Sequence, residues 1–162
     1  MRRVRLSRSL AVAVSASVAL VAVVAGCGGG GSSSSGEPLT AAEYRTQANA
    51  ICAEIQPKVR GVPVPDNRGG IPGYVSAVLP LWQEQADQLR ALQPPAELEQ
   101  DANALVKALD DTTRALVDLQ AAAERGDVAA FQDAFQRGNR ATTKSTQLAQ
   151  SLGLTDCAPK RS

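Results

Sequence analysis

Histidine is absent from this 162-residue chain, which removes the commonest general base and the commonest metal ligand of proteins. Aromatic side chains are scarce as well, with two tyrosines, one tryptophan and two phenylalanines in the whole sequence. A platform on which bases or sugars stack would need several of these on one surface. These absences argue against a stacking surface and against histidine-dependent catalysis, and we expect no metal site and no cofactor.

Positive charge is also sparse outside the N-terminus. The first 26 residues contain four arginines and no other ionisable side chain. Beyond them, 13 basic and 16 acidic side chains remain, so the rest of the chain is mildly acidic. Domains that bind nucleic acid normally carry a broad basic surface, and we therefore expect no nucleic-acid partner.

The N-terminal segment has the pattern of an export signal. Cationic residues (Arg2, Arg3, Arg5 and Arg8) precede an apolar run over residues 10–26, as in secretory signal peptides. A permanent transmembrane helix is the alternative, because about 17 residues is the lower limit for spanning a bilayer. The pair Arg2-Arg3 faintly resembles a twin-arginine signal but lacks its usual Phe-Leu pattern. The general secretory route is preferred, and the choice between the two routes stays open.

A cysteine follows the apolar run directly. Val24-Ala25-Gly26-Cys27 resembles the lipobox of bacterial lipoprotein precursors. Small residues before Cys27 let the peptide enter a narrow protease site, and the thiol can accept a diacylglycerol thioether. The resemblance implies that residues 1–26 are a removed signal peptide and that lipid on Cys27 anchors the protein to the membrane. Two or more acyl chains give a stable anchor, on the extracytoplasmic face of the bacterial cell membrane.

Residues 27–39 are expected to form a lipidated tether. Residues 28–36 read GGGGSSSSG, and nine residues of this kind behave as a random coil with a span of about 15–18 Å. The glycines lack the lysine and the strand–helix setting of a phosphate-binding loop. The segment is therefore interpreted as a spacer between membrane and domain.

The remainder, residues 40–162, is expected to form one all-α domain, an antiparallel up-down four-helix bundle. Apolar residues recur at helical spacings and nowhere alternate long enough to indicate a strand. Thr40 and Glu43 have the spacing of a capping box, so a first helix should run from there to about Arg60. The other helices are expected from about Ile71 to Leu92, from Pro94-Pro95 to Gly126, and from the Asp127 cap to Gly153.

The second expected helix contains a proline and a tryptophan. Pro80 removes one backbone donor and clashes with the preceding turn, which predicts a kink or a late start. Trp82 would suit a partner anchor, but its place on the apolar stripe favours a core residue. The preceding stretch, residues 66–70 (Asp-Asn-Arg-Gly-Gly), is either a polar binding loop or a plain connector.

The apolar stripe of the fourth helix has large residues at both ends and small ones in the middle. Its members are Val128, Phe131, Phe135, Gly138, Thr142, Ser145, Ala149 and Leu152. A close approach by a neighbouring helix would explain the small residues, and we favour this interpretation. The alternative is a polar pocket opposite Thr142 and Ser145, between the second and fourth helices.

Two cysteines remain if Cys27 carries lipid. Cys52 and Cys157 would then meet in an oxidising compartment, where paired thiols form disulfides. Such a bridge would stabilise the fold by about 4–5 kcal/mol in the chain-entropy model. Residues 153–157 would have to run back along the first helix and bury Leu154 on the way, which five extended residues can just achieve. Two free buried thiols are the alternative.

Sparse motifs around these cysteines support a wider resemblance. Ala48-Asn49-Ala50-Ile51-Cys52, together with Leu152-Gly153-Leu154 and Cys157, is similar to small helical lipoproteins and secreted proteins of actinobacteria. The resemblance covers the helical part of the chain. It implies export and pairing of the two cysteines, and it carries no established activity.

The remaining clusters of polar residues favour structural roles. Asp110, Asp111 and Asp118 would offer oxygen ligands to a metal. Lys107 and Arg114 lie four residues from them, however, and so predict a ladder of surface ion pairs: Lys107 with Asp111, and Arg114 with Asp110 and Asp118. Serines and threonines have no histidine to activate them. We therefore expect a protein that is not an enzyme.

Taken together, the residues predict a membrane-anchored helical module that contacts an envelope protein or a cell-wall component. A lipoprotein that binds a small ligand or ion in a pocket between helices is the alternative. The sequence indicates no oligomeric state.

Overall fold

The structure is a computed structural model that describes residues 37–158. The expected signal peptide, the lipobox with Cys27 and most of the expected tether lie outside the described residues. Residues 159–162 lie outside them as well.

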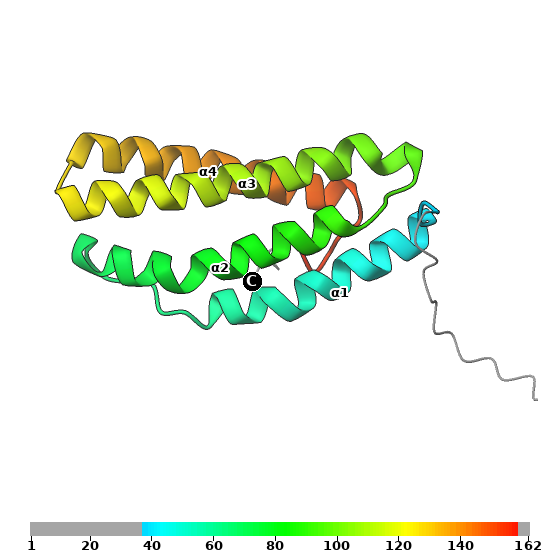
Figure 1. Cartoon of the computed structure of the whole chain (residues 1–162), viewed down its shortest axis with the longest axis horizontal. Coiled ribbons are helices and arrows are strands. Elements are labelled where there is room, and N and C mark those ends of the chain that lie inside the picture. The colour runs from blue at the N-terminus through cyan, green and yellow to red at the C-terminus, as the bar shows by residue number, and fades with distance from the viewer. Residues whose placement is uncertain (1–36, 159–162) are drawn as a thin grey trace, which may run out of the picture. The chain divides into compact units, whose positions relative to one another are not determined.

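Within residues 37–158 the chain forms four α-helices, one short 3₁₀ turn and no strand (Figure 1). The helices are α1 (Ala41–Arg60), α2 (Ile71–Ala91), α3 (Ala96–Arg125) and α4 (Val128–Ser151), and the turn η1 (Arg68–Gly70) precedes α2. Successive helices run antiparallel, and each packs against the next along the chain (Figure 1). The expected all-α up-down bundle is confirmed. None of these helices is both long and apolar enough to cross a membrane.

Local signals set the helix ends as predicted. Thr40 Oγ1 accepts from the Glu43 amide at 3.3 Å, and the Glu43 carboxylate accepts from the Thr40 amide at 2.9 Å. The hydrogen bonds from the side chain and backbone of Thr40 lower the pKa of Glu43. Asp127 caps α4 by accepting from the amide of Ala130 at 3.0 Å. Gly126, with φ +67°, ends α3 in the left-handed conformation that glycine adopts most readily.

Pro80 does not delay α2. The helix begins at Ile71 and continues through Pro80 without interruption, so the late start allowed by the sequence is wrong. The proline leaves the carbonyl of Ser76 without its usual donor. Pro80 and Ser76 are both exposed, so water can bond to that carbonyl and the helix tolerates the loss.

The core lies where α1, α3 and the end of α4 meet. One continuous cluster unites Tyr44, Ala48 and Cys52 of α1 with Leu105 and Leu109 of α3, and with Leu148, Leu152 and Leu154 at the end of α4 and beyond. Leu89 joins it from α2, and Trp82 packs against it while partly buried. The preference for Trp82 as a core residue is supported. Burial also raises the pKa of the Tyr44 phenol.

The first half of the predicted α4 stripe is not in the core. Val128 and Phe135 are 47% and 54% exposed, and Ala134 is buried instead. The buried position in this part of α4 is therefore one residue earlier than in the predicted stripe. In addition, α1 has 20 residues against 30 in α3 and ends before the turn between α3 and α4 is reached (Figure 1). Further along α4 the stripe is correct, because Ser145, Ala149 and Leu152 are buried.

Candidate functional site

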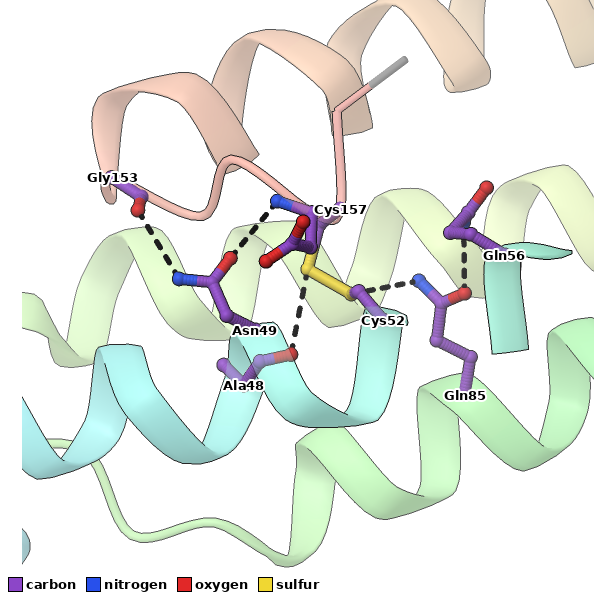
Figure 2. Close-up of a disulfide and its surroundings, with 8 residues drawn as sticks. Ala48, Asn49, Cys52, Gln56, Gln85, Gly153 and Cys157 are labelled. Atoms are coloured by element: carbon purple, nitrogen blue, oxygen red, sulfur yellow. Dashed lines mark hydrogen bonds between the residues drawn. A yellow bond between two sulfur atoms is a disulfide. The ribbon is translucent and has the colours of Figure 1, made fainter. Parts of the chain in front are cut away.

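A disulfide joins α1 to the segment after α4. Cys52 and Cys157 are bonded with an S–S distance of 1.99 Å and a Cα–Cα distance of 4.9 Å, across 105 residues of sequence (Figure 2). Cys52 is fully buried. The predicted pairing is confirmed, and the alternative of two free thiols is wrong.

The C-terminal tail, residues 152–158, returns along α1 as expected. Gly153 has φ +77°, a conformation that reverses the chain and favours glycine. The Leu154 amide then donates to the carbonyl of Ala149 at 2.7 Å. Leu154 is fully buried, so this residue supplies core volume on the path to Cys157.

Polar side chains of α1 fasten this tail. Arg45 Nε donates to the carbonyl of Leu152 at 2.9 Å. Asn49 Oδ1 accepts from the Asp156 amide at 3.0 Å, and its Nδ2 lies 3.5 Å from the carbonyl of Gly153, at the long limit for a hydrogen bond (Figure 2). The tail therefore docks through a polar clamp as well as through the disulfide.

This clamp is absent from the sequence-based predictions. Arg45, Asn49 and Cys52 stand at helical spacings of four and three residues, so they share one face of α1. That spacing is the signal that could have identified them. Ala48 lies beside them, fully buried, and its carbonyl oxygen is 3.7 Å from the sulfur of Cys157. This is a packing contact, because a disulfide sulfur carries no hydrogen to donate.

On the other side of the disulfide, α2 contributes a buried amide. Gln85 is only 2% exposed. Its Oε1 accepts from Gln56 Nε2 at 3.0 Å, and its Nε2 points at the sulfur of Cys52 from 3.5 Å, which makes a weak hydrogen bond (Figure 2). Both ends of this buried amide thus have partners, as buried polar groups require. No sequence signal marked Gln85, since glutamine on a helix is usually exposed.

A cleft opens beside the disulfide, with a volume of about 430 Å³. Its walls come from the second half of α1, with Cys52, Ala53, Gln56, Pro57 and Arg60, and from the tail, with Asp156 and Ala158. Neither Arg60 nor Asp156 takes part in an ion pair within residues 37–158. The cleft is therefore lined by two opposite charges that form no ion pair with each other.

The residues of the predicted interhelical pocket lie on α4 and do not line this cleft. Thr142 is exposed, whereas Ser145 is buried and its hydroxyl donates to the carbonyl of Thr142 at 2.9 Å within the same helix. A Cβ added to Gly138 would stand 3.5 Å from that of Ala115 on α3. The small residues of α4 thus permit a close approach of α3, which was the favoured interpretation.

The acidic residues of α3 are paired on the surface, only partly as predicted. Lys107 bonds to Asp111 at 2.9 Å as expected, but Arg114 also bonds to Asp111, at 3.1 Å. The expected pairs of Arg114 with Asp110 and Asp118 are therefore wrong. The true partners are on neighbouring helices: Arg90 of α2 for Asp110 and Arg137 of α4 for Asp118, each at 2.8 Å.

These interhelical pairs have an electrostatic consequence. The hydrogen bond that Arg90 donates to Asp110 raises the pKa of Arg90, and the one that Arg137 donates to Asp118 raises the pKa of Arg137. Within residues 37–158, no three side chains of the histidine, cysteine, aspartate or glutamate types gather as a metal-ligand set. Asp110 and Asp118 thus connect α3 to its neighbouring helices at the surface.

The stretch of residues 66–70 packs against the far end of α4. The Arg68 guanidinium lies 5.1 Å from the centre of the Phe131 ring, within the range of a cation–π contact. This contact holds the segment against the start of α4.

Comparison with known proteins gives no assignment: no family model, no curated protein and no solved structure matches the chain.

Proposed function

We propose that this protein is a lipoprotein of the extracytoplasmic face of the bacterial cell membrane. Its helical domain would be a non-enzymatic module that contacts an envelope protein or a cell-wall component. The division of labour among the three cysteines carries this proposal. Cys27 follows an apolar leader in a lipobox-like setting, while Cys52 and Cys157 bond to each other.

The disulfide supports export in physical terms. Disulfides persist in oxidising compartments and are rare where cytosolic reductants keep thiols reduced. The pairing of Cys52 with Cys157 leaves Cys27 as the single remaining thiol of the chain. Lipid on that thiol would remove a reactive group that can exchange with the disulfide.

The use of polar side chains supports a non-enzymatic role. The chain has no histidine. The buried polar groups at the disulfide, such as Gln85, and the clamp residues Arg45 and Asn49 are engaged in holding helices and tail together. These groups hold the structure together, as expected for a module that binds a partner without catalysing a reaction.

Membrane fractionation with lipid labelling tests the anchor. The whole chain, expressed in a bacterium that processes lipoproteins, should incorporate an alkyne-labelled fatty acid and sediment with membranes. Cys27→Ala should lose the label and resist cleavage of the leader, whereas the matched tether variant Ser33→Ala should behave like the wild type. Label retained by Cys27→Ala, or absent from the wild type, would contradict the proposal.

Cross-linking in whole cells tests the binding role. The lipidated protein should enrich the same envelope component in repeated purifications, and a variant with the bundle removed after residue 40 should not. If nothing is enriched above that control in repeated experiments, the proposed role as a contact module is wrong.

A further inference from the structure

The cleft between α1 and the C-terminal tail has the dimensions of a small-molecule site. Its volume of about 430 Å³ falls within the range of about 300–1,000 Å³ that is usual for ligand pockets. Much of its wall is apolar, with Ala53 and Pro57 on α1 and Ala158 on the tail. This part of the wall suits a short hydrocarbon side chain.

Two formal charges face the same cleft. Arg60 is exposed at the last residue of α1, and Asp156 is half-buried on the tail. Neither belongs to any ion pair of the described domain. A guanidinium recognises carboxylates through paired N–H donors, and a carboxylate accepts from an ammonium group. The cleft thus offers partners for both charges of one zwitterion.

Pro57 adds a third polar group. A proline has no amide hydrogen, so the carbonyl of Ala53, four residues earlier, loses its normal helical donor. Ala53 is exposed and lines the cleft. A carbonyl without a helical partner seeks another donor, and a ligand N–H in the cleft can provide it. The proline therefore leaves the carbonyl of Ala53, a residue of the cleft wall, without a helical donor.

We propose that this cleft binds a small zwitterionic molecule, an amino acid or a short peptide. Arg60 receives the carboxylate of the ligand. The ammonium group of the ligand lies between the Asp156 carboxylate and the carbonyl of Ala53. Its side chain packs against Pro57 and Ala158. This site is independent of any envelope contact, and it differs from the interhelical pocket expected around Thr142 and Ser145.

The site depends on the disulfide. Asp156 and Ala158 flank Cys157 in sequence, and they reach the cleft because the bond to Cys52 and the Asn49 clamp hold the tail on α1. Reduction breaks the bond next to Asp156 and Ala158, so this wall and the Asp156 charge are no longer held in place against the cleft. Binding is therefore confined to the oxidised protein.

Isothermal titration calorimetry with the whole chain in detergent micelles tests this proposal. The probes are leucine and dialanine, each compared with its N-acetylated and its C-amidated form. The zwitterions should bind, and each blocked form should bind at least about tenfold more weakly, because each loses one charged partner. The reduced protein should bind none of them.

Variants localise the effect. Asp156→Asn and Arg60→Gln should each weaken binding by about tenfold or more. The matched substitutions Glu99→Gln and Arg125→Gln, on exposed positions of α3 away from the cleft, should change nothing. The proposal is overturned if no zwitterion binds at millimolar concentration, if blocked forms bind equally well, or if the α3 variants lose as much affinity. The comparison of ligands on the wild type stands even where a variant fails to fold.

Discussion

The two ends of α4 follow the same apolar pattern and reach different degrees of burial. At the near end, where α1 begins and the tail returns, Tyr44, Leu152 and Leu154 are no more than 1% exposed. At the far end, beside the turn between α3 and α4, Val128 and Phe135 are about half exposed. Apolar periodicity therefore identifies which face of a helix can be buried, whereas the reach of its neighbours decides whether it is.

The tail accounts for much of the closure at the near end. It brings Leu154 into the core and fixes itself by a covalent bond and by side chains of α1. At the far end the buried side chains come from α2 and α3, with Val75, Val78 and Ala122, and Arg68 lies over the ring of Phe131. The start of α4 should thus contribute less to stability than its end and the tail, and four experiments test this contrast.

Removal of the disulfide should have the largest effect. Replacing both Cys52 and Cys157 by alanine should lower the free energy of unfolding by about 4–5 kcal/mol, because the unfolded chain gains the freedom of a long loop. Urea denaturation of the oxidised protein and the double variant measures this. The reduced wild type is the control and should match the variant. Equal midpoints for the oxidised protein and the variant would show that the disulfide does not stabilise the fold.

Truncation of one large side chain at each end compares the ends directly. Leu154→Ala should cost about 2–5 kcal/mol, as expected for a fully buried leucine. Phe135→Ala should stay within about 0.5 kcal/mol, because the ring is mostly in water. Thermal and urea denaturation of both variants provide the test. An equal loss of unfolding free energy in Phe135→Ala and Leu154→Ala would contradict the contrast between the two ends.

The polar clamp should have a smaller effect, confined to the tail. Asn49→Ala removes the acceptor of the Asp156 amide and should cost about 1 kcal/mol. Asn49→Asp keeps that acceptor and should cost less. Hydrogen exchange at the Asp156 amide should accelerate in the alanine variant. Asn139→Ala, an exposed position on α4, is the control and should leave that exchange rate unchanged.

The smallest effect concerns Tyr44 and appears only at alkaline pH. Burial raises the pKa of its phenol above the ordinary value of 10.0, so the folded state binds the proton more tightly than the unfolded state does. Its contribution to stability is complete below pH 10 and declines as the pH rises through the folded-state pKa. Urea denaturation above about pH 10 should show less decline in Tyr44→Phe than in the wild type.

Tyr74→Phe is the control for this prediction. Tyr74 is only partly buried, so this variant should keep the alkaline decline of the wild type. The same decline in Tyr44→Phe would exclude Tyr44 as its source.

Local chemistry explains what the sequence could predict. The caps at Thr40, Gly126 and Asp127 act within one turn of the chain, so a reader of the sequence can find them. The return of the tail also followed, because Cys52 and Cys157 constrain it to one path. These features depend on neighbours in sequence or on a covalent bond.

Features that depend on how helices are rotated and how far they extend could not be predicted. The burial of Ala134 in place of Phe135 follows from the rotation of α4 against its neighbours, which no residue of α4 encodes. The pairing of Asp110 with Arg90 requires α2 and α3 to lie in one particular register. The burial of Gln85 likewise follows from its place opposite Cys52, on another helix. Such contacts emerge only when all helices are packed together.

The roles of the three cysteines can be measured together by peptide mapping of the mature protein, with mass spectrometry under non-reducing conditions. We predict an N-terminal peptide that begins at Cys27 and carries diacylglycerol, together with a cross-linked pair of peptides that contain Cys52 and Cys157. An unmodified Cys27 thiol, or a disulfide from Cys27 to either of the other two, would contradict the account.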